Sequence, residues 1–211
     1  MWHVVHAATS EVIFGTTEEL KKSKNVWCIL VNNWRYADIK FNDCANGPGV
    51  RVSFWVQGCP NHCHNCHNPE TWEPTGGKEF TEETLQLVLQ KMNENNVERG
   101  LSILGGEPCA KYNIDLILYI IKTVKEKYTM RDIYLWTGFT LAELSTQLTP
   151  EQYATLSNNI DYLIDGPYIE AQRDITLPLR GSKNQKIYHI KHNLLKNGTI
   201  DCEYEDITER F

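Results

Sequence analysis

Three cysteines, Cys59, Cys63 and Cys66, lie within eight residues of the chain. They follow an apolar run of strand type at 50–56, so their thiols share one short loop. Three thiolates on one loop can hold three corners of an iron–sulfur cube, which leaves the fourth iron without a protein ligand. A cube that only carries electrons usually has all four irons ligated, whereas an open iron can bind a small molecule that reacts. The spacing therefore favours catalysis.

The same spacing also fits a structural zinc site of the Cys3His type, because His62, His64 and His67 lie beside the cysteines. Two observations favour the iron–sulfur interpretation. The sequence lacks the second CxxC knuckle that small zinc folds need, and a GGEP loop at 105–108 follows downstream. The other cysteines are expected to be buried or inert thiols; they are Cys28, Cys44, Cys109 and Cys202.

The bulk composition is that of an ordinary globular protein, with 41% hydrophobic and 23% charged residues among 211. This length predicts a single domain, in which we expect an N-terminal extension at 1–34, a core at 35–190 and a C-terminal hairpin at 191–211. Within the extension, short β-type runs at 12–14 and 26–31 flank a predicted helix at 17–24. An Asn-Gly pair at 197–198 predicts the turn of the hairpin.

Charge and hydropathy exclude several classes of partner. The formal net charge is −6 and no basic block is present, so neither nucleic acid nor an anionic membrane is an expected partner. The longest apolar runs are too short to span a bilayer, and the N-terminus lacks the pattern of a secretion signal. We therefore expect a cytoplasmic protein. In that reducing compartment, an odd number of cysteines points to metal binding or redox chemistry.

From about residue 50 onward, short β-type runs alternate with amphipathic helices. Thr81, Thr140 and Thr149 are predicted helix caps, and apolar residues at helical spacing predict another helix near 114–121. Such β–α repeats predict an α/β fold with a parallel sheet and right-handed crossovers, either an open sheet or a partial (β/α) barrel. The expected strands are 50–56, 101–104, 132–136 and 160–164.

An unusual loop follows each of these four strands. The cysteine loop follows the first, and the others are Gly105–Pro108, Thr137–Phe139 and Asp165–Tyr168. Parallel α/β folds place their active sites at the carboxyl ends of the strands. We therefore expect the four loops to converge on one site.

A C-x3-C-x2-C loop with a downstream GGE sequence is the pattern of the radical S-adenosylmethionine (SAM) enzymes, and the chain resembles that superfamily. More closely, it resembles the activating enzymes of anaerobic ribonucleoside-triphosphate reductase over about residues 35–189. The segments that carry this resemblance are Asn46–Arg51, Gly58–Cys59, Cys66–Asn68, Thr71–Trp72, Leu101–Pro108, Asp132–Gly138, Asp165–Gly166, Arg180–Ser182 and Asn184–Gln185.

The resemblance implies that Cys59, Cys63 and Cys66 ligate one 4Fe–4S cluster and that S-adenosylmethionine chelates the open iron. Two groups of residues would then contact this cofactor. The group along the adenine side, through backbone contacts, is Asn65, Cys66 and His67. The group that meets the methionine amino group is Gly105, Gly106 and Glu107. Glycines suit such a wall because they let a ligand approach the backbone closely.

This sequence departs from the superfamily pattern at three of these positions. Familiar radical enzymes place an aromatic residue where this chain has Asn65, although close relatives of the reductase activases commonly have a small residue there. His67 stands where tyrosine is common among those relatives. Glu107 stands where many relatives have aspartate, and the charge is kept.

The implied activity is that of an enzyme that generates a glycyl radical on the large subunit of the reductase, with a flavodoxin-like protein as the electron donor. One rival is an activase of another glycyl-radical enzyme, of the pyruvate formate-lyase type. A rival from another class is a non-catalytic iron–sulfur or zinc module. A third is a degenerate member of the family that only binds the reductase.

Overall fold

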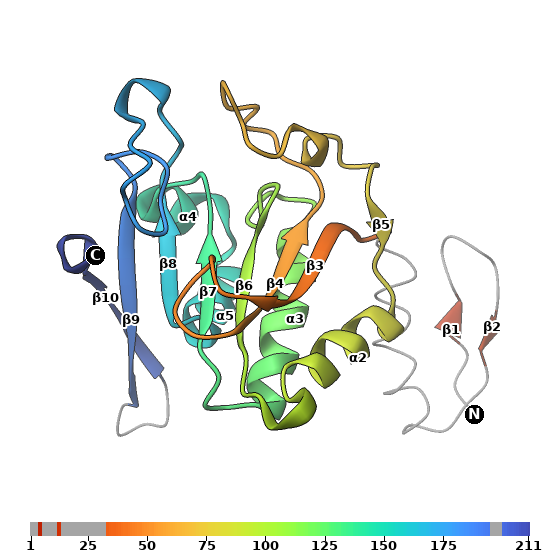
Figure 1. The fold of residues 1–211 in the computed structure, drawn as a ribbon. Helices are drawn as coiled ribbons and strands as arrows, with labels where there is room; N and C mark the ends of the chain where they lie inside the picture. Colours follow the sequence, from red (N-terminus) through yellow and green to blue (C-terminus); the bar gives the residue numbers. More distant parts are fainter. Residues whose placement is uncertain (1–3, 6–11, 14–32, 195–199) are drawn as a thin grey trace.

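The structure is a computed structural model that describes residues 4–5, 12–13, 33–194 and 200–211 (Figure 1). The predicted elements of the N-terminal extension between residues 14 and 32, Cys28 and the turn at 197–198 lie outside these ranges. The strands are β1 Val4–Val5, β2 Val12–Ile13, β3 Arg35–Asp43, β4 Arg51–Val56, β5 Lys78–Glu79, β6 Gly100–Gly105, β7 Ile133–Trp136, β8 Tyr162–Asp165, β9 Lys186–Leu194 and β10 Ile200–Asp206. The α-helices are α2 Glu82–Lys91, α3 Ile114–Lys127, α4 Leu141–Gln147 and α5 Pro150–Asn159, and short 3-10 turns are Pro69–Thr71, Glu94–Asn96, Glu170–Gln172 and Thr208–Arg210.

The main sheet has eight strands in the order β10-β9-β8-β7-β6-β4-β3-β5. Its centre is parallel, because β4, β6, β7 and β8 run in the same direction. Both flanks are antiparallel: β3 joins β4 and β5 on one side, and β9 joins β8 and β10 on the other. The carboxyl ends of the four parallel strands therefore share one edge, the upper edge in Figure 1.

Three of the helices begin where the sequence predicts. Thr81, Thr140 and Thr149 each accept a hydrogen bond from the backbone N–H three residues later, and each forms a complete capping box. Pro150 occupies the first turn of α5, where its missing N–H leaves no hydrogen bond unmade. Local sequence chemistry thus accounts for the start of each of these helices.

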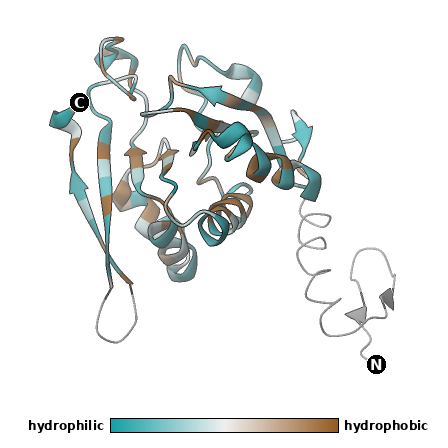
Figure 2. Cartoon of the chain, turned by 60° about the horizontal axis from the view of Figure 1, so that its bottom comes forward, coloured by the Kyte–Doolittle hydropathy of each residue, from teal (hydrophilic) through white to brown (hydrophobic). Residues whose placement is uncertain are grey.

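The apolar core lies between the helices and one face of the sheet. Side chains alternate along a strand, so Val52, Phe54 and Val56 of β4 face the helices and are fully buried. They pack in one cluster with Leu85 of α2 and Ile117 of α3. In Figure 2 the hydrophobic residues form stripes along the helices and central strands, with hydrophilic residues between them. Burial of this face positions the strand ends that carry the site.

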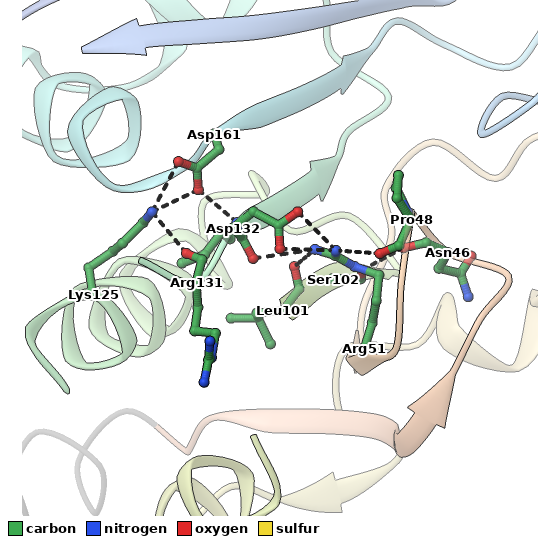
Figure 3. A network of polar contacts seen from close by, with 10 residues as sticks. Asn46, Pro48, Arg51, Leu101, Ser102, Lys125, Arg131, Asp132 and Asp161 are labelled. Atoms are coloured by element: carbon green, nitrogen blue, oxygen red, sulfur yellow. Dashed lines mark hydrogen bonds and ion pairs between the residues drawn. The ribbon is translucent and has the colours of Figure 1, made fainter. Parts of the chain in front are cut away.

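The opposite face of the sheet is polar near the amino ends of the strands (Figure 3). The fully buried Arg51 donates from Nε to Ser102 Oγ at 2.5 Å, and Ser102 Oγ donates to the carbonyl of Asn46 at 2.5 Å. Arg51 also donates to the carbonyl of Pro48 at 3.1 Å. These bonds hold the 44–50 segment, which connects β3 to β4, against the sheet.

The expected α/β fold is confirmed, with two differences. The sheet is mixed rather than parallel throughout, and a partial barrel of the radical SAM type stays a prediction. In addition, β3 was not expected from the sequence, because Arg35–Asp43 carries several charged residues and reads poorly as a strand. β3 forms by antiparallel pairing to β4, a long-range contact. The predicted C-terminal strand pair is present as β9 and β10.

Candidate functional site

One cavity of about 340 Å³ opens at the carboxyl ends of the parallel strands. All four of the predicted loops contribute to its wall, so their expected convergence on one site is confirmed. The residues from these loops are Cys59, Asn61, Cys63, Asn65, Cys66, His67, Asn68, Gly105, Gly106, Glu107, Thr137, Gly138, Gly166 and Tyr168. A cavity of this size is within the range of small-molecule and cofactor sites.

The cysteine loop, residues 59–68, is held at its base by backbone hydrogen bonds. Gly58 N donates to the carbonyl of Thr71 at 2.7 Å, and Cys59 N donates to the carbonyl of Trp72 at 3.0 Å. Within the loop, Cys66 N donates to the carbonyl of Cys63 at 3.1 Å, which closes a tight turn between the second and third cysteines. Asn65 has a φ of 56°, a left-handed conformation that asparagine tolerates better than most residues.

The three thiols are free and partly exposed. Burial raises the pKa of the Cys59 thiol to about 11 and also raises the pKa of Cys63. Binding to iron requires the thiolate, and a metal ion deprotonates a coordinating thiol outright. Three soft sulfur donors on one loop at the mouth of a cavity therefore fit an iron–sulfur cluster.

Within the described ranges, no group of three His, Cys, Asp or Glu side chains converges as the ligands of a single metal ion do.

Glu107 is a buried carboxylate at the back of the cavity, with 1% of its surface exposed. Its Oε1 accepts from Thr137 Oγ1 at 2.7 Å and from Cys109 N at 2.9 Å. Its Oε2 accepts from Gly138 N at 2.7 Å and from Asn61 Nδ2 at 3.1 Å. Burial raises the pKa of Glu107, and the four donors oppose that shift because they favour the charged form.

The two glycines at the carboxyl end of β6, Gly105 and Gly106, lie against the strand and loop beside them. A Cβ on Gly106 would stand 2.3 Å from the carbonyl oxygen of Gly58, and a Cβ on Gly105 would stand 2.9 Å from the backbone of Trp55. Gly105 also has a φ of 106°, which favours glycine. The GGE segment can adopt this position only without side chains at its first two residues.

The remainder of the cavity wall combines aromatic and apolar side chains with polar ones. Trp55 and Leu104 come from the strands and Trp136 from the end of β7, while Gly181 and Gln185 come from the segment that precedes β9. Asn46, from the segment between β3 and β4, lines this part of the cavity. Trp136 also packs against Tyr134, with ring centroids 6.0 Å apart. The periodicity of apolar residues in the sequence does not indicate that Trp55, Leu104 and Trp136 line the same cavity.

The other cysteines differ from one another. Cys109 is buried directly behind Glu107, Cys202 is partly exposed in β10, and Cys44 is exposed. Of the expected buried or inert thiols within the described residues, Cys109 is thus a buried one, and the inertness of the exposed Cys44 stays a prediction. Asn61 and Asn113 are two site residues that the sequence did not single out. The side chain of Asn113 donates to the carbonyls of Gln57, Gly58 and Glu107.

Known proteins resemble this chain over most of its length. The family model described as "4Fe-4S single cluster domain" matches residues 45–188. The anaerobic ribonucleoside-triphosphate reductase-activating protein of Vibrio cholerae serotype O1 is 37% identical over 147 residues, which cover 69% of this chain and 92% of that protein. The protein of the same name from Escherichia coli strain K12 is 33% identical over 150 residues, with coverages of 71% and 94%.

A phage protein matches as well. The activating protein of the same name from Enterobacteria phage T4 is 33% identical over 146 residues, which cover 69% of this chain and 88% of that protein. The matched region of the family model includes the cysteine loop, the GGE segment and the loops after β7 and β8. It supports an iron–sulfur cluster in this chain. No helix within the described residues is long and apolar enough to cross a membrane. The chain belongs to the family of anaerobic ribonucleoside-triphosphate reductase-activating proteins.

Proposed function

We propose that this protein activates anaerobic ribonucleoside-triphosphate reductase by generating a glycyl radical on the large subunit of that enzyme. The observation that carries the proposal is the convergence of a three-cysteine loop and a GGE segment on one cavity, in a chain of this family. The mixed sheet, with its site loops after the parallel strands, is compatible with the partial barrel of radical SAM enzymes.

Cys59, Cys63 and Cys66 are the proposed ligands of a single 4Fe–4S cluster. Three protein ligands leave one iron free for the amino and carboxylate groups of S-adenosylmethionine. When bound and reduced, the cluster supplies the electron that cleaves the sulfonium to methionine and a 5′-deoxyadenosyl radical, which takes a hydrogen atom from the glycine Cα of the partner. The chain itself needs no general acid or base for this chemistry.

The remaining site residues position the cofactor. Backbone groups of Asn65, Cys66 and His67 would lie along the adenine. The wall formed by Gly105, Gly106 and Glu107 would face the methionine ammonium, where the buried negative charge of Glu107 favours a cation. The glycines allow close approach of the ligand to the backbone.

The partner's glycine segment has to enter the same cavity, beside the proposed cofactor. The aromatic part of the wall, with Trp55 and Trp136, offers an apolar surface where water is excluded from a reactive radical. A flavodoxin-like protein is the proposed electron donor to the cluster. The reductase and the donor are thus the two macromolecular partners.

The test is anaerobic reconstitution of the protein, followed by incubation with dithionite, S-adenosylmethionine and the reductase of the same organism. We expect the doublet of a glycyl radical in the electron paramagnetic resonance spectrum of the reductase. Omission of S-adenosylmethionine should abolish the doublet. In a separate reaction that contains S-adenosylmethionine, reduced flavodoxin in place of dithionite should also give the doublet, at a lower rate. Cleavage of S-adenosylmethionine without a radical on this reductase, but with one on pyruvate formate-lyase, would reassign the partner.

A further inference from the structure

We propose that Glu107 is a positioning residue, which acts through Asn61 to hold the cysteine loop against the loops that follow β6 and β7. Glu107 belongs to the GGE segment, Thr137 and Gly138 follow β7, and Asn61 lies between the first two cysteines. The carboxylate touches all three loops, so it sets where the thiols stand relative to the rest of the cavity wall.

The hydrogen-bonding capacity of the carboxylate supports this role. An ionised carboxylate offers about four acceptor positions, and the protein itself fills four with two donors on each oxygen. Only 1% of the residue is exposed. The oxygens of Glu107 are therefore occupied before any ligand arrives. The carboxylate can attract the ammonium proposed above by its charge, while its hydrogen bonds serve the loops.

The glycine after Thr137 leaves the space that Asn61 uses. A Cβ on Gly138 would stand 2.3 Å from Asn61 Nδ2 and 3.2 Å from Glu107 Oε2. Any larger residue at 138 would push the amide of Asn61 away from the carboxylate. The absence of a side chain at Gly138 is therefore what allows the contact between Asn61 and Glu107.

Glutamine is not an equivalent replacement at position 107. Its amide group has one acceptor oxygen, so its NH2 must face either the Thr137 and Cys109 donors or the Gly138 and Asn61 donors. Each pair includes a backbone N–H that cannot become an acceptor. Glu107→Gln therefore leaves a buried donor unpaired and loosens one side of the contact.

The first experiment uses the full chain with reduced thiols and no cluster, and measures amide hydrogen exchange. We compare Glu107→Ala, Asn61→Ala and the double variant with the natural protein, because glutamine at 107 can keep the bond to Asn61 by turning its NH2 toward Thr137 and Cys109. Each alanine change removes the contact between the two side chains and should raise the exchange rate of residues 61–67 about tenfold, as expected when one buried hydrogen bond is lost. The double variant should exchange no faster than the faster single variant, because both changes break the same contact.

Gly138→Ala is an independent variant that leaves both partners intact. It should reproduce the exchange pattern of Asn61→Ala. The matched control is Asp161→Asn, which removes a carboxylate bonded to Lys125 and to the N–H of Ile133 at the opposite edge of the sheet. This control should lower overall stability without changing exchange in residues 61–67.

The second readout is retention of the cluster, measured as the rate of iron release to a chelator from anaerobically reconstituted protein. Asn61→Ala and Gly138→Ala should release iron several-fold faster than Asp161→Asn at equal overall stability. The proposal is overturned if Asn61→Ala and Gly138→Ala leave loop exchange and iron release at the natural rates. It is also overturned if Glu107→Ala weakens S-adenosylmethionine binding with unchanged loop exchange, which would make Glu107 a direct ligand.

The positioning role of Glu107 depends on the proposed function only for the identity of the cofactor that the cysteine loop holds. Loop exchange in the cluster-free chain needs neither S-adenosylmethionine nor a reductase. If no glycyl radical forms but the variants raise loop exchange as expected, only the proposed function is wrong. If the glycyl radical forms but the variants leave loop exchange unchanged, only the positioning role of Glu107 is wrong.

Discussion

Arg51 and Asp132 form an ion pair across the sheet, with Arg51 Nη1 at 3.1 Å from each carboxylate oxygen of Asp132. The two side chains differ in exposure to solvent, since Arg51 is 1% exposed and Asp132 is 41% exposed. Arg51 also lies over the ring of Tyr134, 4.4 Å from its centroid. The pair ties the start of β4 to the start of β7 (Figure 3).

Arg51→Met should destabilise the protein by about 3 kcal/mol, because it leaves Ser102 and backbone carbonyls without their buried donor. Asp132→Asn should cost less than about 1 kcal/mol, since water can replace the exposed side of that carboxylate. Urea denaturation monitored by circular dichroism measures both values. Equal losses in the two variants would show that the ion pair, rather than the buried network of Arg51, carries the stability.

Replacement of any one of Cys59, Cys63 or Cys66 by alanine should prevent stable assembly of the cluster, since two thiolates cannot hold the cube. Iron and acid-labile sulfide analysis after anaerobic reconstitution checks this. Cys202→Ala is the matched control, because Cys202 lies in β10, outside the cavity. Full iron and sulfide content in a Cys63→Ala protein would contradict the proposed ligand set.

Gly106→Ala should lower the free energy of unfolding of the cluster-free protein by about 2 kcal/mol, because its Cβ would meet the backbone oxygen of Gly58. Gly49→Ala separates this steric effect from backbone strain. Gly49 has a φ of 75° with no atom within 4 Å of the added Cβ, so only the cost of a left-handed alanine, about 1 kcal/mol, applies there. Thermal unfolding of both variants gives the comparison. A smaller loss for Gly106→Ala than for Gly49→Ala would refute the close approach of the two loops.

Asp206 should contribute to the pH dependence of stability. The Thr208 hydroxyl donates to its Oδ1 at 2.6 Å and lowers the pKa of Asp206, with help from the Thr208 N–H and from Lys186. A group whose pKa is lower in the folded state stabilises the protein above the unfolded pKa, about 3.9, and this contribution is lost as pH falls through the folded value. Asp206→Asn should cost less than about 1 kcal/mol at pH 7, since solvent screens the half-exposed carboxylate.

The difference between Asp206→Asn and the natural protein should shrink as pH falls below about 4, where the carboxyl group becomes protonated. Urea midpoints measured at a series of pH values from acid to neutral test this trend. A difference that stays constant across the series would mean that the substitution disrupts packing around Thr208 and that ionisation of Asp206 has no part in it.

Local chemistry in the sequence was enough to predict most of the elements around the site. The three threonine caps, the β-branched strands and the loops after them were all readable, because each depends on residues close together in the chain. The cysteine loop was readable for the same reason. Its thiols, the GGE segment and the Thr-Gly loop were also expected at one sheet edge, since parallel strands end on the same side.

Tertiary structure alone decided which side chains meet across that edge. The sequence offered no reason to place Asn61 beside Glu107, or Arg51 beside Asp132, because such contacts depend on strand register and on burial that bring distant residues together. β3 was missed for a related reason, since its charged sequence forms a strand only through pairing with β4. Chain-local patterns determine the elements, whereas the desolvated contacts between them depend on packing that no short segment encodes.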